Sequence, residues 1–257
     1  YKLGFLERGA ELYLRWFHNQ CHLNFCPSQE IKSKLTPKGF TNLTIWGRGI
    51  DTGFFSPQKK SNILKKMAPD KNLFFLYVGR LAPEKDLDVL FNAWQEVSPK
   101  LPGNQLVITG DGPQAEELKQ KYGLTALFTG YKHGEELAAI YAGADVFVFP
   151  STTETFGNVV LEAMSSGLPV IGASAGGVKN LLVDGYNGFT CSPRNHHEMA
   201  NAMLRLGQNK QLHSELSRQA REYALNHAWD DILNNLLHSY EELISRHKEA
   251  KTISLGA

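Results

Sequence analysis

From residue 43 onward, short apolar runs alternate with segments of helical period, a pattern that few folds can satisfy. The apolar runs have the length of strands and occupy residues 43–46, 73–78, 105–109, 126–129, 145–149 and 169–173. Between most of them, apolar side chains recur at three- and four-residue steps, as at Leu137, Ile140 and Tyr141. Continuous apolar strands separated by amphipathic helices are typical of a parallel sheet covered on both faces. The sequence therefore predicts an α/β fold with a doubly wound parallel sheet.

Helical patterns also stand at both ends of the chain. Residues 2–20 combine apolar, aromatic and basic side chains at helical spacing, and a short strand is expected at 23–26. Further helices are expected near residues 196–206, 210–225 and 229–247. The first helix suits packing against a further part of the protein, which we favour, while weak association with a membrane surface stays open. Because the chain begins at Tyr1 with a helical pattern, we interpret it as part of a longer protein.

Composition disfavours several classes of protein. The apolar runs are far too short to span a bilayer, and the sequence shows no signal peptide. The 27 basic and 26 acidic residues give no electrostatic reason to expect nucleic-acid binding. The three cysteines match no metal or redox spacing, so we expect reduced thiols and a cytoplasmic protein. Side chains at adjacent positions point in different directions, so His196 and His197 are not expected to share a metal, and we predict no metal site.

Ligands of doubly wound sheets bind outside the carboxyl ends of the strands, near the point where the strand order reverses. After the run 73–78 come Gly79, Arg80 and Lys85, where the glycine permits a tight turn before a helix. Two cations beside a helix N-terminus suit a diphosphate. A strand-to-helix turn with solvated charges fits these residues equally well, so both interpretations stay open at this point.

The next strand is followed by a second glycine-containing loop. Gly110 and Gly112 precede Pro113, which is typical of a tight loop before a helix. In a dinucleotide-binding fingerprint the third small residue would be Ala115, which is permitted, but the strand at 126–129 ends without an acidic residue to hold a ribose. A dehydrogenase is therefore disfavoured.

The segment 150–163 carries two glutamates around an expected helix start near Phe156. Glu154 falls in the polar loop before that helix, and Glu162 falls inside it. Six helical residues advance about 9 Å, so the carboxylates should lie roughly 10 Å apart. That is too far for the pair of a retaining glycosidase, which needs about 5 Å. It suits a ligand with hydroxyl groups at both ends and an anion between, as in a nucleotide sugar, although a surface helix with a capping glutamate is the simpler alternative.

Short motifs follow one another in a fixed order along the chain. They are Gly49-Ile50-Asp51 with Phe55-Ser56-Pro57, Gly79-Arg80-Leu81 with Glu84-Lys85, Gly110-Asp111-Gly112-Pro113, Gly130-Tyr131, Ala144-Asp145, Pro150-Ser151, the two glutamates, Gly167-Leu168-Pro169-Val170, Gly176-Gly177, and Asp184-Gly185 with Gly188-Phe189. In these motifs, the stretch from about residue 28 to residue 242 resembles the C-terminal half of family 4 retaining glycosyltransferases with the GT-B fold.

The resemblance implies three parts of the chain. Residues 1–40 would be the last helix and strand of an N-terminal acceptor domain, of which only this remnant is present. Residues 41–228 would be the Rossmann-like domain that binds a nucleotide sugar. Residues 229–257 would be a C-terminal helix that crosses back to the N-terminal half, followed by a tail.

The resemblance also implies roles for individual residues. Carried over by position, Arg80 and Lys85 would hold the donor diphosphate and Glu154 the hydroxyl groups of the donor sugar, and these three are the expected catalytic residues. Glu162 would bind the ribose, and neither glutamate would act as nucleophile or general base. The other expected donor-binding residues are Gly79, Gly110, Tyr131, Lys132, Thr155, Phe156, Gly157, Asn158 and Val159, with Tyr131 and Lys132 beside the base. No metal and no cofactor are implied.

The implied reaction is transfer of a hexose from a GDP-mannose- or UDP-glucose-type donor to a lipid or carbohydrate acceptor with retention of configuration. This chain would supply the donor site, transfer sugar poorly alone, and leave the acceptor to the missing N-terminal domain; the full protein would be cytoplasmic or peripheral to the inner face of a membrane. The segment 46–51 resembles mannosyl- and glycolipid-forming members, whereas residues 177–180 lack an acid that many relatives carry. Two alternatives stay open, a non-catalytic nucleotide-sugar-binding module and a sugar-nucleotide epimerase of the same fold.

Overall fold

The computed structural model of the chain contains two compact units. It describes the backbone of residues 4–255 and the side-chain surroundings of residues 8–29 and 31–246, so the first residues of the helix expected at 2–20 lie outside the described range. One unit is formed by Ile50–Ala228, and the other by the residues before and after it. The sheet domain therefore begins at Ile50, later than the expected start at residue 41.

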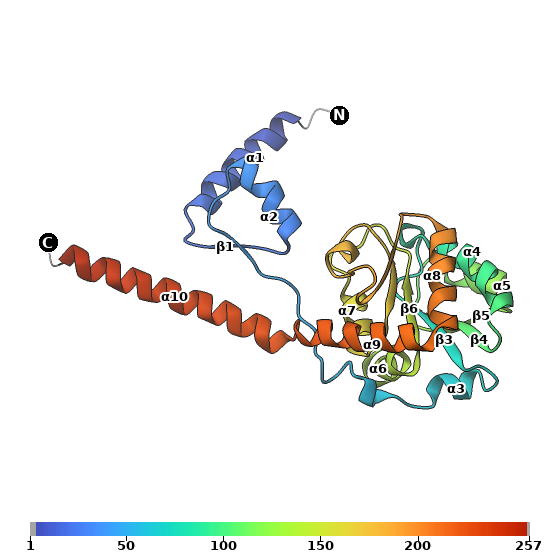
Figure 1. Cartoon of the computed structure of the whole chain (residues 1–257). Helices are drawn as coiled ribbons and strands as arrows, with labels where there is room; N and C mark the ends of the chain where they lie inside the picture. The colour runs from blue at the N-terminus through green and yellow to red at the C-terminus, as the bar shows by residue number, and fades with distance from the viewer. Residues whose placement is uncertain (1–3, 256–257) are drawn as a thin grey trace. The chain divides into compact units, whose positions relative to one another are not determined.

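Six parallel strands form the main sheet of the unit Ile50–Ala228 (Figure 1). Their order across the sheet is β5-β4-β3-β6-β7-β8. The chain builds the sheet outward from β3 to β5 on one side and then from β6 to β8 on the other. The strands are β3 (Leu73–Val78), β4 (Asn104–Thr109), β5 (Ala126–Gly130), β6 (Val146–Phe149), β7 (Val170–Ala173) and β8 (Gly188–Cys191). This order confirms the predicted doubly wound α/β fold and places the switch point between β3 and β6.

Helices cover both faces of this sheet. Connections that run in opposite directions from the switch point, each of the usual right-handed kind, put their helices on opposite faces. Consistent with this, α4 packs against α8 and α7 packs against α9. The helices are α3 (Ile63–Met67), α4 (Leu87–Val97), α5 (Ala115–Tyr122), α6 (Gly134–Gly143), α7 (Asn158–Ser165), α8 (His196–Gln208) and α9 (Lys210–Leu225).

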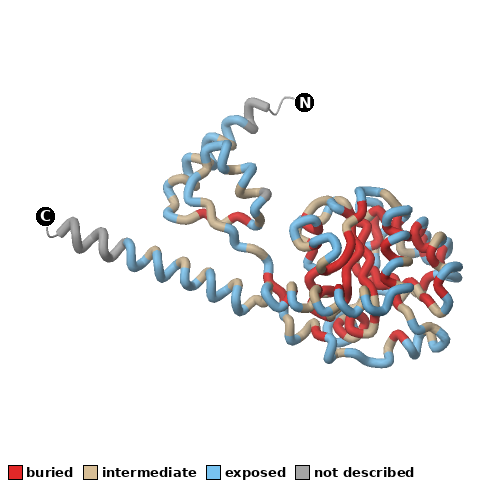
Figure 2. Tube along the Cα trace, viewed as in Figure 1, coloured by how far each residue is buried: buried red, intermediate tan, exposed pale blue. Residues whose placement is uncertain are grey.

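The core of this unit lies on the central strands, which are buried on both faces (Figure 2). Phe75 and Tyr77 of β3, Phe147 of β6 and Trp94 of α4 are almost fully buried. The rings of Phe75 and Trp94 meet edge to face at 6.0 Å, and those of Tyr77 and Phe149 stack at 5.9 Å. Such aromatic side chains each bury a large apolar area, so the central strands and α4 form the hydrophobic core of this unit.

Two strands differ from the expectation. The apolar run at 43–46 forms β2 (Leu43–Ile45), which pairs with β1 (Asn24–Cys26) in a separate two-stranded parallel sheet, and not with the main one. Strand β8 was not expected, because it is a four-residue edge strand that begins with glycine and pairs only with β7. A periodicity identifies a strand but not its partner, and it fails for a run this short.

The second unit contains the ends of the chain. Its helices are α1 (Gly4–Asn19), α2 (Gln29–Leu35) and α10 (Trp229–Leu255), and the rings of Phe25 and Tyr240 meet edge to face at 6.3 Å. Large apolar side chains on α1 are exposed; they are Leu12, Tyr13, Leu14, Trp16 and Phe17. Over the described part of the chain, no helix has both the length and the apolar character to cross a membrane.

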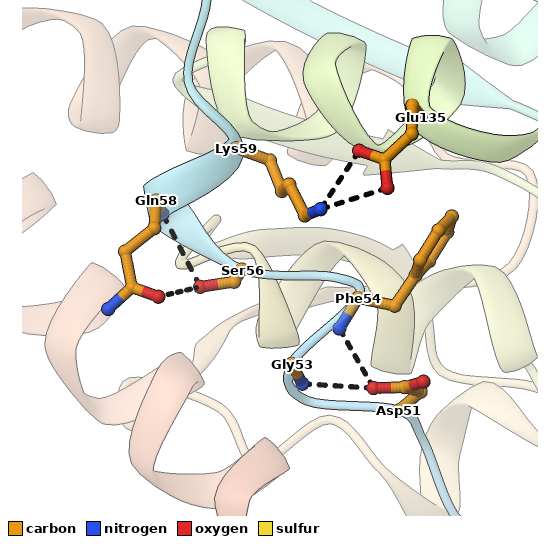
Figure 3. Close-up of polar contacts among 7 residues, drawn as sticks. All are labelled: Asp51, Gly53, Phe54, Ser56, Gln58, Lys59 and Glu135. Carbon is orange, nitrogen blue, oxygen red and sulfur yellow. Dashed lines mark hydrogen bonds and ion pairs between the residues drawn. The ribbon is translucent and has the colours of Figure 1, made fainter.

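The chain enters and leaves the sheet unit at neighbouring points. The backbone N–H of Ile50 donates to the carbonyl of His227 over 2.9 Å, and Ile50 forms a bridge with Ala228. The segment that follows is fixed by side chains (Figure 3): the Asp51 carboxylate accepts from the N–H groups of Gly53 and Phe54, and Lys59 pairs with Glu135 of α6 at 2.9 Å. The start of the sheet unit is therefore held to its helical layer before the first strand begins.

Candidate functional site

The loops after β3 and β4 lie backbone against backbone at the carboxyl edge of the sheet. The N–H of Gly79 donates to the carbonyl of Thr109 over 3.0 Å. Gly110 has φ +142°, and a Cβ at this position would lie 1.9 Å from the carbonyl oxygen of Gly79. Gly112 is similar, with a Cβ position 2.4 Å from the carbonyl oxygen of Leu81. Only glycine permits this approach, so Gly110 and Gly112 allow the loop after β4 to lie directly against the loop after β3.

Lys85 and Glu154 meet across the switch point. Lys85 closes the short 3₁₀ turn after β3 (Pro83–Lys85), and Glu154 lies in the loop after β6. Their Nζ and Oε2 atoms are 2.8 Å apart, and the side chains are only 18% and 23% exposed. Next to them, the Thr153 hydroxyl donates to the carbonyl of Glu84 over 2.9 Å. The cationic loop and the carboxylate loop therefore form one continuous surface at the switch point.

Asp86, which the sequence analysis did not single out, holds three loops together. Its backbone is left-handed at φ 51° and its side chain is buried. The carboxylate accepts from the hydroxyl of Thr152 over 2.6 Å and from its N–H over 3.2 Å, and it also accepts from Nε of Arg194 over 3.1 Å. Because Thr152 follows β6 and Arg194 follows β8, the positions of Lys85 and Glu154 depend on this carboxylate.

The helix after β6 begins at Asn158, two residues later than the expected start near Phe156. Gly157 has φ +78°, which breaks the helical backbone just before it and leaves the first N–H groups of α7 without a side-chain cap. The loop after β7 packs on the residues that precede: Gly177 donates its N–H to the carbonyl of Glu154 over 2.6 Å. An uncapped helix N-terminus of this kind presents N–H donors and a partial positive charge, as anions require.

Glu162 lies on α7, half-buried, and accepts a hydrogen bond from the hydroxyl of Tyr141 of α6 over 2.9 Å. Burial raises the pKa of the Glu162 carboxyl above its usual value, and the Tyr141 hydrogen bond partly offsets this. Burial, followed by the charge of Glu162, raises the pKa of Tyr141 well above its ordinary value. Tyr141 is therefore a constant hydrogen-bond donor that orients this carboxylate.

Other expected site residues lie at the same edge but are not drawn into this cluster. Arg80 is 65% exposed and pairs with Glu84 at 3.6 Å, and Lys132 after β5 pairs with Glu136 of α6. Of the remaining positions, Tyr131, Thr155 and Asn158 are exposed, Phe156 and Val159 are half-buried, and Gly157 is buried. Within the described chain, no hydrogen bond joins Arg80 to Glu154, the partner of Lys85.

The family model of Glycosyl transferases group 1 matches residues 58–223, which include β3 to β8 and all the site loops described above. The chain belongs to this family.

Relatives in the glycosyl transferases group 1 family match almost the whole chain. The sulfoquinovosyl transferase SQD2 of Arabidopsis thaliana is 34% identical over 240 residues, which are 89% of this chain and 46% of the relative. A GDP-mannose-dependent alpha-mannosyltransferase of Corynebacterium glutamicum is 34% identical over 250 residues, which are 95% of this chain and 58% of the relative. The chain therefore spans about half the length of the curated relatives it matches.

Solved structures agree on the fold. Sucrose-phosphate synthase of Thermosynechococcus elongatus superposes with a TM-score of 0.77 at 24% identity, covering 93% of this chain and 62% of that protein. The solved structures therefore support the assignment of the sheet unit to the glycosyltransferase fold predicted from the motifs.

Sequence reasoning missed Asp86, Tyr141 and Arg194 as parts of the site. Tyr141 was recognised only as an apolar position of a helix. Helical periodicity predicts which face of a helix is buried, but not which group the tyrosine hydroxyl bonds. Asp86 and Arg194 both have left-handed backbone, at φ 51° and φ 60°, which no side-chain pattern announces. Aspartate is among the few residues that tolerate this conformation, and that was the available signal for Asp86.

Proposed function

We propose that this chain supplies the donor site of a retaining hexosyltransferase that uses a nucleotide diphosphate sugar. The supporting observation is the meeting of Lys85 and Glu154 across the switch point, beside the uncapped N-terminus of α7. Ligands of doubly wound sheets bind at such a point. A cation, a helix N-terminus without a side-chain cap and a carboxylate match the diphosphate and the sugar of one ligand.

In the proposed complex, the diphosphate lies against the N-terminus of α7 and takes Lys85 as its cation. The sugar hydroxyls donate to Glu154, which the diphosphate has separated from Lys85. The ribose hydroxyls donate to Glu162, whose carboxylate Tyr141 holds in place. Arg80, at the exposed rim of the same loop, adds charge at the diphosphate.

In the proposed reaction, the bond between the anomeric carbon and the β-phosphate oxygen breaks, and an acceptor hydroxyl oxygen bonds the same face of that carbon. The acceptor hydroxyl passes its proton to the released phosphate oxygen. Negative charge grows on the leaving diphosphate. Lys85, Arg80 and the N–H groups of α7 stabilise that charge, and such preorganised groups supply a large part of many rate enhancements. The proposal needs neither a metal nor a covalent role for either glutamate.

The donor proposed is a GDP-mannose- or UDP-glucose-type sugar nucleotide. Support for the GDP-mannose type comes from the 34% identical relative whose name states this dependence. The acceptor, a lipid or a carbohydrate, is proposed to bind mainly to an N-terminal domain, because the relatives are about twice as long as this chain. The unit formed by the chain ends is proposed to belong to that domain.

Titration calorimetry with UDP, GDP and their sugars tests the donor site. The chain should bind one diphosphate better than the matching monophosphate, because Lys85 and α7 act on the diphosphate. Lys85→Ala should weaken the diphosphate by about 10- to 100-fold, the value of one charge-assisted hydrogen bond. The exposed Lys119→Ala in the last turn of α5 is the matched control and should change nothing. If neither diphosphate bound at about millimolar concentration, the proposal would fail.

A further inference from the structure

Three side chains outside the donor site meet where α4 and α8 pack together. Nε2 of His196 lies 3.4 Å from Oε1 of Glu96, and Nδ1 of His197 lies 2.8 Å from the same oxygen. The three ligand atoms lie within 4.8 Å of one another. The expectation that these adjacent histidines point apart is wrong, because both rings turn toward α4, with centroids 4.1 Å apart.

The backbone that carries the histidines is fixed by its own caps. The side chain of Asn195 accepts from the N–H of Glu198 over 3.2 Å. The Glu198 carboxylate in turn accepts from the N–H of Ser192 over 2.6 Å and from the Asn195 amide over 2.7 Å. These hydrogen bonds fix the backbone of the first turn of α8 without a ligand. The Glu198 carboxylate takes part in them and is therefore not counted as a ligand of the metal site.

Two imidazole nitrogens and one carboxylate oxygen are a usual donor set for zinc and similar transition metals. At bond lengths of about 2.0–2.2 Å, neighbouring ligand atoms of a tetrahedral ion lie roughly 3.3–3.6 Å apart. The separation of His196 from Glu96 already has this value, and the 70% exposed side chain of His197 has room to move outward from its 2.8 Å contact. We propose that Glu96, His196 and His197 bind one divalent transition-metal ion, with water in the fourth position.

Two electrostatic effects act in opposite directions on a cation bound at Glu96, His196 and His197. The partial positive charge at the N-terminus of α8 disfavours a cation, and the Glu96 carboxylate must offset it. Without a metal the same atoms form ordinary ion pairs when the imidazoles are protonated. Since a metal binds neutral imidazole, protons compete with the ion for the two histidines. A bound ion would join α4 to α8 at a point separate from the donor loops.

Zn²⁺ alone is the probe, titrated into the whole chain by calorimetry at about pH 7.5, where free imidazole is neutral, with the thiols kept reduced. One ion should bind with a dissociation constant in the micromolar range or below, and the melting temperature should rise with it. His197→Ala and Glu96→Gln should each weaken this binding at least about tenfold. The matched control is His238→Ala, which removes another exposed histidine–glutamate pair (3.3 Å from Glu242) and should leave binding unchanged.

Both substituted side chains are partly exposed, and circular dichroism of each variant verifies the fold. His196→Ala provides a third measurement should either variant unfold. The proposal is overturned if no ion binds at about 100 µM, or if the three site variants bind Zn²⁺ as tightly as the parent. It is also overturned if the His238 control loses affinity to the same extent as they do.

Discussion

Lys85 donates to Glu154 over 2.8 Å, so the cation expected to hold the phosphates is already neutralised by the carboxylate expected to hold the sugar. The two side chains come from loops 69 positions apart in the sequence. A diphosphate that takes Lys85 must release Glu154, and the released carboxylate then needs new donors. Sugar hydroxyls would supply them, so this ion pair couples recognition of the two ends of the donor.

Glu154→Gln should separate those two contributions. With no carboxylate to displace, Lys85 should bind free UDP or GDP as tightly as in the parent protein, or up to about tenfold more tightly. The sugar nucleotide should lose its advantage over the free diphosphate. Calorimetry of both ligands measures this, with Glu222→Gln, which removes the exposed pair with Arg218 on α9, as the control. Equal weakening of both ligands would contradict the division of roles.

Glu162→Gln should change stability in a pH-dependent way. Because burial raises the pKa of the folded carboxyl, folding favours its protonated form, and this contribution to stability is lost as pH rises through the raised pKa. The glutamine stays neutral and still accepts from Tyr141, so the variant should unfold at a higher temperature at neutral pH. The difference should disappear below the usual pKa of 4.5.

Thermal unfolding of parent and variant across that pH range checks the sign. The same substitution should weaken nucleotide binding at neutral pH, since an amide is a poorer acceptor for ribose hydroxyls than a carboxylate. A variant that was less stable than the parent at neutral pH would show that burial is not the dominant influence on Glu162.

Asp86→Ala should destabilise the sheet unit by about 1–3 kcal/mol, because it leaves the two donors of the half-buried Thr152 without their acceptor. Asp86→Asn keeps an acceptor and tolerates the left-handed backbone, so it should cost about half as much. Arg194 is mostly exposed and its share is small. Urea unfolding measures these changes, and the exposed Asp88→Asn in the first turn of α4 is the control, which should cost less than about 1 kcal/mol. Equal stability of the Asp86→Ala variant and the parent would exclude this bridging role.

Gly110→Ala should be among the most damaging small substitutions in the chain. The added methyl would lie 1.9 Å from the carbonyl oxygen of Gly79, so both loops must move, at a cost above about 3 kcal/mol and with loss of nucleotide binding. Gly130→Ala is the matched control, because it also has positive φ but no atom within 4 Å of the new methyl. It should cost only the backbone strain of about 1–2 kcal/mol. Similar losses in the two variants would mean that strain, and not the close approach, governs this position.

The fold followed from the sequence where apolar runs were long. Strand β3 has six residues, and every position from Phe74 to Val78 is buried. An apolar run of this length predicts both a strand and its burial on both faces. The pattern failed for β8, where only Phe189 among four residues is a large apolar side chain, and for β2, whose partner strand no periodicity specifies. Expected helices near 196–206 and 210–225 were confirmed within two residues, because capping asparagines stand at 195 and 209.

For the candidate site, the sequence singled out residues that stand in or beside a motif, such as Lys85, Glu154 and Glu162, and their roles toward a donor stay predictions. The ion pair between Lys85 and Glu154 was not predicted, because a contact between loops depends on how the strands are ordered. Asp86 bonds to Thr152 and Tyr141 bonds to Glu162, and nothing in their neighbours along the chain distinguishes them from a turn aspartate and a core tyrosine.

The bridge between Ile50 and Ala228 has a consequence for how this protein is built. A sheet unit whose two ends are adjacent can be inserted into another polypeptide without stretching its host, and its termini can be joined by a short linker and reopened elsewhere. Residues 50–228 therefore have the end-to-end geometry of a domain that can be inserted into another protein. Insertion of residues 50–228 into a different host protein would transfer all the site loops together, because every strand that supports them lies between Ile50 and Ala228.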